Sequence, residues 1–224
     1  MNTSNSNART KASVDSLVGI DSRRLLPSDD QWPIRLAGST YAFLDVVGDA
    51  TMLSNSMTAI FSSSRCTGDA ILRSTKWIGD VADDETRSVV GGFHSAMEKG
   101  FLEILREGKC RICVCPARSL DRFRIPRSFK AAIGSGRLAI VSSLPSSIRS
   151  NSTRSSHHRN QMVADLAEKI IITHASEDSR TEQFALTLLQ SGRGVHCLDS
   201  GCKRLLANGA KIIADNSSAR RSSE

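Results

Sequence analysis

The stretch from Ser88 to Pro116 restricts the fold of this chain more than any other part of it. Two β-branched valines, typical of a buried strand, stand directly before Gly91 and Gly92, which allow a tight turn. Apolar residues then return at helical spacing, and a second short apolar run ends the stretch. The pattern predicts a strand, a helix and a second strand, which together form the repeating unit of a parallel sheet.

The glycine turn of this unit is a candidate ligand site. The helix that follows it begins with backbone N–H groups that have no partner inside the helix, and the missing side chains at Gly91 and Gly92 would let an anion approach them. His94 and Ser95 stand beside these groups. A glycine pair before a helix is equally an ordinary structural turn, so both interpretations stay open here. Neither GxGxxG nor GxxxxGK[ST] occurs in the chain, and no cofactor is predicted.

The same alternation of patterns continues through most of the chain. Strands are predicted at residues 58–62, 87–90, 111–115, 138–142, 169–174, 194–198 and 211–214. Helices are predicted at residues 69–81, 94–106, 125–133, 157–167, 181–190 and 203–207. The alternation predicts an α/β fold, Rossmann-like and doubly wound, with a mostly parallel sheet and helices on both faces. Ligands of such sheets bind beyond the carboxyl ends of the strands, an edge that we call the rim. The turns at 62–68 and 91–95 and the polar loop ending at Asn160 should share it.

The chain divides by composition into four parts. Residues 1–24 are rich in Ser, Asn and Arg and predict a disordered polar tail, and residues 25–57 are broken by Pro and Gly and predict an irregular lead-in. Residues 58–214 form the predicted Rossmann-like domain, and residues 215–224 a second polar tail. No apolar run reaches the roughly 18 residues of a membrane helix, and the first residues do not form a secretory signal. We therefore expect a cytoplasmic protein without a membrane segment.

Basic residues are concentrated in one part of the chain. The net charge is +7, and the segment from Arg118 to Arg159 holds nine Arg or Lys residues against the single acid Asp121. Such a segment predicts a surface for an acidic partner, with nucleic acid as the first choice. A solvated basic face without a partner is the alternative.

The six cysteines do not form a convincing metal site. Cys110, Cys113 and Cys115 crowd together and Cys197 and Cys202 form a second pair, but the first group runs into a predicted buried strand. Ligands on such a strand cannot converge easily on one ion, and the C-x-x-C pair has no counterpart elsewhere. We interpret all of them as reduced structural thiols and predict no metal.

Five segments match, in order and spacing, the motifs of one protein family. They are Asp29–Leu36, Val47–Asp49, Ile60–Arg65, Arg159–Leu166 and Asp199–Ala210. Together they resemble the DNA-processing protein A (DprA/Smf) family, whose core is a Rossmann-like domain of the SLOG superfamily. The resemblance covers about residues 26–213. The family's two glycine-rich turns are replaced here by residues 90–98 and 177–182, which indicates a divergent branch.

The resemblance implies a function and a site. Members of the family bind single-stranded DNA taken up in transformation, form homodimers and help to load a RecA-type recombinase. For this chain the resemblance implies a non-catalytic protein that binds single-stranded DNA, in DNA uptake and recombination. The candidate DNA- or phosphate-binding residues are Ser63, Ser64, Arg65, Gly91, Gly92, His94, Ser95, Arg159 and Asn160.

A second function class stays open. Other SLOG proteins bind nucleotide-derived ligands, and some are phosphoribohydrolases, so a ligand sensor or a related enzyme is the alternative. Glu98, close to the glycine turn, could act as a general base in such an enzyme. A surface glutamate favoured by the helix dipole is the simpler interpretation. No catalytic residue is assigned.

Overall fold

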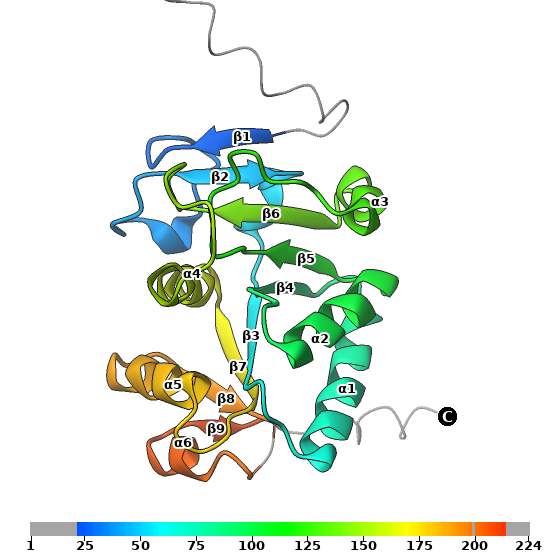
Figure 1. Ribbon diagram of the computed structural model, residues 1–224, viewed down its shortest axis with the longest axis vertical. Coiled ribbons are helices and arrows are strands. Elements are labelled where there is room, and N and C mark those ends of the chain that lie inside the picture. The colour runs from blue at the N-terminus through cyan, green and yellow to red at the C-terminus, as the bar shows by residue number, and fades with distance from the viewer. Residues whose placement is uncertain (1–21, 199, 214–224) are drawn as a thin grey trace, which may run out of the picture.

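The computed structural model describes residues 22–198 and 200–213, and in them one mixed sheet runs along the whole molecule (Figure 1). The order of its nine described strands is β1-β2-β6-β5-β4-β3-β7-β8-β9. Their bounds are β1 Ser22–Leu25, β2 Leu44–Val47, β3 Thr58–Ser62, β4 Ser88–Gly91, β5 Arg111–Val114, β6 Leu138–Ser142, β7 Lys169–His174, β8 Val195–Cys197 and β9 Lys211–Ile212. The strands from β3 to β9 are parallel to one another, so the predicted α/β fold with a mostly parallel sheet is confirmed.

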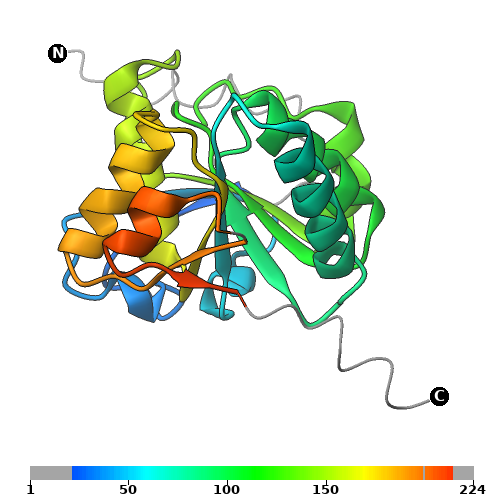
Figure 2. The same cartoon turned by 90° about the horizontal axis from the view of Figure 1, so that it is seen from below.

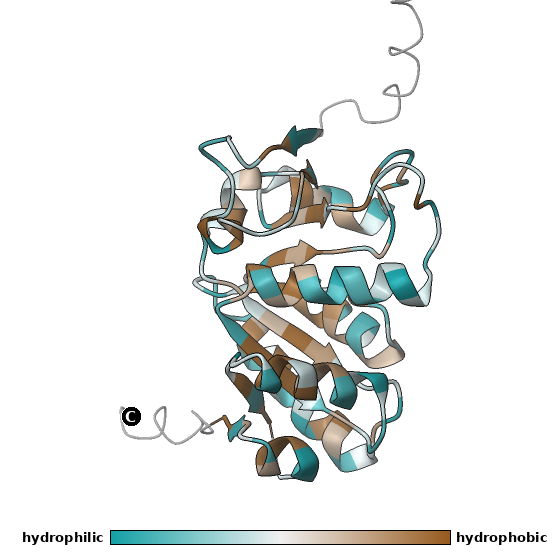
Figure 3. Ribbon diagram, turned by 90° about the vertical axis from the view of Figure 1, so that its left-hand side faces the viewer, coloured by the Kyte–Doolittle hydropathy of each residue, from teal (hydrophilic) through white to brown (hydrophobic). Residues whose placement is uncertain are grey.

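Helices cover both faces of this sheet (Figure 2). Their bounds are α1 Gly68–Ala82, α2 Ala96–Glu107, α3 Lys130–Gly134, α4 Thr153–Leu166, α5 Arg180–Gln190 and α6 Lys203–Ala207, with short 3₁₀ helices η1 Ile34–Leu36, η2 Ala50–Ser54 and η3 Arg127–Phe129. Alternate residues of each strand face opposite sides, so one strand serves two cores. In β3, Ile60 packs with α1 and α2, whereas Ala59 and Phe61 pack with α4 and α5. Figure 3 shows the apolar strands behind the more polar outer surface of α4 and α5.

The lead-in is more regular than its sequence predicts. β1 begins at Ser22, inside the range expected to be a tail, and β2 lies between residues 25 and 57. Both strands extend the sheet antiparallel, with β2 paired to β6. The prediction of an irregular segment is therefore wrong, because the Pro and Gly residues that interrupt this part of the sequence do not prevent short strands from pairing with the sheet. The remaining tail residues, 1–21 and 214–224, lie outside the described part of the chain.

α4 begins four residues earlier than predicted. Its N-cap is Ser152, and a capping box joins the side chains and backbones of Ser152 and Ser155. Serine at the third helical position is a weaker signal than the usual Glu or Gln, which explains why the sequence predicts a loop up to residue 156. In the described part of the chain, no helix is both long and apolar enough to cross a bilayer.

The strand order has its switch point at β3. From β3 the chain builds β4, β5 and β6 on one side of it and then returns to place β7, β8 and β9 on the other. The turns after β4 and β7 therefore flank the end of β3, where the connections diverge. A crevice at such a point is the usual ligand site of an open α/β sheet.

Candidate functional site

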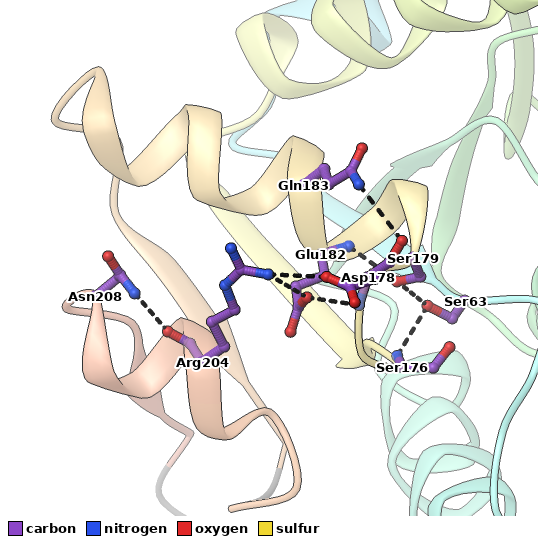
Figure 4. Close-up of polar contacts among 8 residues, drawn as sticks. All are labelled: Ser63, Ser176, Asp178, Ser179, Glu182, Gln183, Arg204 and Asn208. Carbon is purple, nitrogen blue, oxygen red and sulfur yellow. Dashed lines mark hydrogen bonds and ion pairs between the residues drawn. The ribbon is translucent and has the colours of Figure 1, made fainter.

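The turns after β3, β4 and β7 meet at the rim, as the sequence predicts. Ser63, just beyond β3, joins the first of these turns to the last (Figure 4). Its hydroxyl donates to the Ser179 Oγ at 2.9 Å and accepts from the Ser176 backbone N–H at 3.1 Å. The Ser176 hydroxyl in turn donates to the carbonyl oxygen of Arg65 at 3.3 Å. These bonds fix the turn between β3 and α1 against the turn between β7 and α5.

Glu98 fixes the same turn from the other side. Its carboxylate accepts the Ser62 backbone N–H at 3.1 Å, the His94 backbone N–H at 2.9 Å and the Ser95 backbone N–H at 3.4 Å. Ser95 caps α2 and completes a capping box with Glu98. Glu98 is only 8% exposed, so the interpretation as a surface residue is wrong. It is a buried link between the ends of β3 and β4.

This link changes the expected anion site. The His94 and Ser95 amides at the start of α2 were the predicted ligands of a phosphate group, but the Glu98 carboxylate already accepts both of them. A negative group of the protein itself thus stands where the sequence predicts an external anion. His94 keeps an exposed side chain, whose Nδ1 lies 3.5 Å from the Asn151 amide nitrogen.

Gly92 has a defined steric role. A Cβ added there would lie 2.1 Å from the Arg159 Nη1, so only glycine leaves room for the guanidinium. Arg159, 5% exposed, donates from Nη1 to the Cys115 carbonyl at 3.1 Å and from Nε to the Asn160 Oδ1 at 2.7 Å. Burial lowers the pKa of Arg159, and the nearby Glu98 carboxylate opposes that shift. The expectation that Arg159 faces solvent at the rim is wrong, because the space above Gly92 is large enough to bury it.

The turn between β3 and α1 differs from its neighbours because it is open. Ser64 and Arg65 are exposed, and neither side chain has a hydrogen-bond or ion-pair partner within residues 22–198 and 200–213. Their backbone N–H groups are likewise unbonded in that part of the chain. α1 starts directly behind them, capped by the Thr67 side chain, and its fifteen residues give the turn a favourable dipole.

The basic segment divides between the rim and other places. Arg118 and Arg149 lie on the rim side of the sheet, where the Ser119 backbone N–H donates to the Ile148 carbonyl oxygen beyond β5 and β6, and Arg122 and Arg124 follow in the loop toward η3. Arg122 has a positive φ of 56°. Arg137 instead precedes β6 and donates to the carbonyl oxygens of Cys110 and Arg106. Only part of the predicted positive charge is therefore available to a ligand at the rim.

The turn between β7 and α5 carries the opposite charge (Figure 4). Asp178 is exposed, has a positive φ of 55° and contacts Arg204 at 3.1 Å. The Asp178 backbone N–H donates to the buried Glu182 carboxylate at 2.9 Å, which also lies 3.5 Å from the Arg204 Nη1. Glu177 adds a second exposed acid. An anion meets repulsion on this side of β3.

The nine predicted site residues thus fall into three groups. Ser64, Arg65 and His94 are exposed at the rim, whereas Ser63, Gly91 and Arg159 are buried in the contacts that shape it. Gly92, Ser95 and Asn160 lie half-buried between these groups. Sequence reasoning missed Ser176 and Ser179 as partners of Ser63. The Ser-x-x-Glu spacing of Ser179 and Glu182 marks a helix start, so it could have placed Ser179 at the end of the turn after β7.

None of the six cysteines, all of which lie in the described part of the chain, is paired in a disulfide. Cys113 and Cys115 are buried in and just after β5, with their sulfur atoms 4.0 Å apart. The hydrogen-bonding contact with the Cys115 thiol, together with burial, raises the pKa of Cys113 well above its usual value, so the thiol stays protonated. Residues 22–198 and 200–213 contain no group of three or more potential metal ligands.

A family model described as DNA recombination-mediator protein A matches residues 23–222. The chain belongs to this family. The match spans both antiparallel strands of the lead-in and the whole parallel sheet, so the family core includes the part that the sequence predicted to be irregular. No curated protein is similar enough in sequence to match the chain.

Solved structures of the family share the fold at low sequence identity. DNA processing protein A from Streptococcus pneumoniae aligns with a TM-score of 0.71 and 18% identity, over 90% of this chain and 74% of that one. The Helicobacter pylori protein, described as having a unique single-stranded DNA binding mode, aligns with a TM-score of 0.70 and 18% identity, over 90% of this chain and 95% of that one. A molybdenum cofactor binding protein from Rippkaea orientalis reaches a TM-score of 0.50 at 8% identity, over 75% of this chain and 94% of that one.

Proposed function

We propose that this member of the DNA recombination-mediator protein A family binds single-stranded DNA at the rim, as a non-catalytic protein of DNA uptake and recombination. The observation that carries the proposal is the open turn between β3 and α1, where Ser64, Arg65 and unbonded N–H groups are exposed together at the switch point. Donors of this kind bind phosphate oxygens. The description of the Helicobacter pylori protein supports single-stranded DNA as the ligand.

The binding surface extends from this turn toward β5 and β6 rather than toward β7. Arg118 and Arg149 supply positive charge beyond the ends of β5 and β6, whereas Asp178 repels phosphates on the other side. Among the described residues, few aromatic side chains are available for stacking, and Phe93 and Phe129 are buried. Binding to DNA is therefore mainly electrostatic and depends little on the base sequence.

The buried residues of the site act by positioning. Glu98 and Ser63 hold the open turn from its two sides, and Arg159 supports the glycine turn from below. A carboxylate that accepts three backbone N–H groups is committed to structure, which argues against Glu98 as a general base. The homodimer, the RecA-type partner and the cytoplasmic location implied by the family stay predictions.

The proposal is tested by fluorescence anisotropy of a labelled single-stranded oligonucleotide at two salt concentrations. We expect the logarithm of affinity to fall linearly with the logarithm of salt, by about 0.7 for each phosphate contact. A mixture of mononucleotides at the same phosphate concentration should compete poorly, because each contacts only one cation at a time. Absence of binding at low salt, or binding that one mononucleotide abolishes, would refute a DNA-binding rim.

A further inference from the structure

An open hollow of about 680 Å³ lies away from the switch point, on the outer side of α4. Its walls are the loop residues Thr40 and Tyr41 and five residues of α4, which are Thr153, Arg154, His157, His158 and Gln161. Arg154, His157, His158 and Gln161 follow the i, i+3, i+4, i+7 pattern and so share one face of the helix. Arg159 and Ser155 point instead into the protein, so the hollow and the glycine turn lie on different sides of α4. Figure 3 views the face on which α4 lies.

Hydrogen bonds hold the walls of the hollow in place. The Tyr41 hydroxyl donates to the Asp165 Oδ2 at 2.8 Å, and the Gln161 amide donates to the Asp165 Oδ1 at 2.9 Å. His158 lies with its Nε2 2.8 Å from the Ser143 hydroxyl and meets the Tyr41 ring edge to face at 5.7 Å. These contacts order Tyr41, His158 and Gln161 before a ligand binds, which lowers the entropy cost of binding.

The chemistry of the lining suits a flat anion. Tyr41, His157 and His158 present rings, and Thr40 and Thr153 add hydroxyl groups. Arg154 is exposed and has no hydrogen-bond or ion-pair partner among residues 22–198 and 200–213. Among the described residues, no Asp or Glu lines the hollow. The nearby Asp165 carboxylate accepts hydrogen bonds from Tyr41 and Gln161 and forms an ion pair with Arg193. An uncommitted guanidinium beside flat rings binds a phosphate and an aromatic base together.

We propose that this hollow is a second binding site, which takes a mononucleotide through its base and phosphate independently of DNA at the rim. Its volume falls within the roughly 300–1,000 Å³ of ordinary small-molecule sites. The ring of His157 and the Tyr41–His158 pair would contact the base, and Arg154 would bind the phosphate. The site does not depend on the proposed function, because none of the arginines assigned above to the DNA-binding surface lines it.

The test measures binding of 5′-mononucleotides, the matching nucleosides and inorganic phosphate by isothermal titration and ligand-observed NMR. We expect at least one mononucleotide to bind more tightly than its nucleoside and than phosphate, and Arg154→Ala to weaken it by about tenfold, the loss of one charge-assisted contact. His157→Ala should weaken it further through the lost ring. Arg180→Ala is the control, because Arg180 is an exposed arginine at the start of α5 outside the hollow.

Labelled single-stranded DNA, measured in parallel, separates this inference from the proposed function. Arg154→Ala should leave oligonucleotide affinity within about twofold of the parent, a difference below half a kcal/mol. Failure of the parent protein to bind DNA would count against the rim and leave the hollow standing. The hollow is overturned if no mononucleotide binds, if Arg65→Ala rather than Arg154→Ala abolishes the binding, or if Arg154→Ala reduces only oligonucleotide affinity.

Discussion

The turns after β4 and β7 flank β3 and are built alike, yet they offer a ligand opposite surroundings. Each has a residue with positive φ, Phe93 or Asp178, followed by a serine N-cap and a buried glutamate three positions into the helix. In each, the glutamate accepts the backbone N–H four residues before it. The two turns differ in the residues that surround this common backbone arrangement. The first turn contacts β3 and buries Arg159, whereas the second exposes acids, so charge rather than backbone shape distinguishes the two sides.

The comparison also shows why neither flanking turn is the main anion site. In both, the protein's own carboxylate already accepts an N–H group at the helix start, which is the group that would otherwise bind phosphate. The turn between β3 and α1 has no such carboxylate. In the proposed function, the flanking turns therefore act as supports and the turn between them as the binding element.

The largest expected effect comes from removing the two glutamates. Glu98→Ala leaves three backbone N–H groups without their acceptor and should lower the free energy of unfolding by about 3 kcal/mol, since each buried unsatisfied group costs roughly 1–3 kcal/mol. Glu182→Ala removes one backbone acceptor and should cost about 1–2 kcal/mol. Urea denaturation of both variants measures the difference. Equal losses would mean that Glu98 does not link the two strands.

The next effect concerns the space above Gly92. Gly92→Ala places a methyl group where the Arg159 guanidinium lies, so we expect a loss of about 2 kcal/mol in unfolding free energy and weaker DNA binding. Gly100→Ala is the matched control, since nothing lies within 4 Å of its Cβ, and it should stabilise α2 by about 0.5–1 kcal/mol.

A double-mutant cycle identifies the cause of the Gly92 effect. If the methyl group acts by displacing the guanidinium, Gly92→Ala should cost much less in an Arg159→Ala background, with a coupling of about 1 kcal/mol or more. Additive losses would show that the glycine serves the backbone of the turn and not Arg159.

The smallest expected effect tests the electrostatic difference between the two flanking turns. Asp178→Asn removes one exposed negative charge beside the open turn and should raise affinity for single-stranded DNA by about two- to threefold at low salt, with the gain lost at high salt. Asparagine accepts the positive φ of this position, and the contact with Arg204 is exposed, so stability should change by less than about 0.5 kcal/mol. Unchanged affinity at low salt would mean that Asp178 does not repel DNA bound at the open turn.

Much of this architecture follows from the sequence because the strands are buried on both faces. The runs at Leu138–Ser142 and Lys169–His174 have the bounds that their apolar residues predict. The lead-in strands escaped prediction because pairing, of β2 with β6 and of β1 with β2, makes them strands, and not their local pattern. Tertiary context decides such short segments.

The site could be predicted only in part, for a related reason. The turns that meet at the rim follow from the parallel sheet, so Arg65 and the glycine turn could be placed together. The burial of Glu98 and Arg159 could not, because it depends on contacts across 36 and 44 residues of chain. A charged residue near a glycine turn has the same local signal whether it binds a ligand or holds the turn in shape.

The open turn after β3 is tested most directly by comparing Arg65→Ala with Arg111→Ala in the anisotropy assay. Both arginines are exposed, but Arg111 begins β5 and so lies at the opposite edge of the sheet. We predict that Arg65→Ala weakens single-stranded DNA binding by about tenfold and reduces the salt slope by about 0.7, while Arg111→Ala changes neither. Equal affinities for Arg65→Ala and the parent, or equal losses in the two variants, would contradict a DNA site at the switch point.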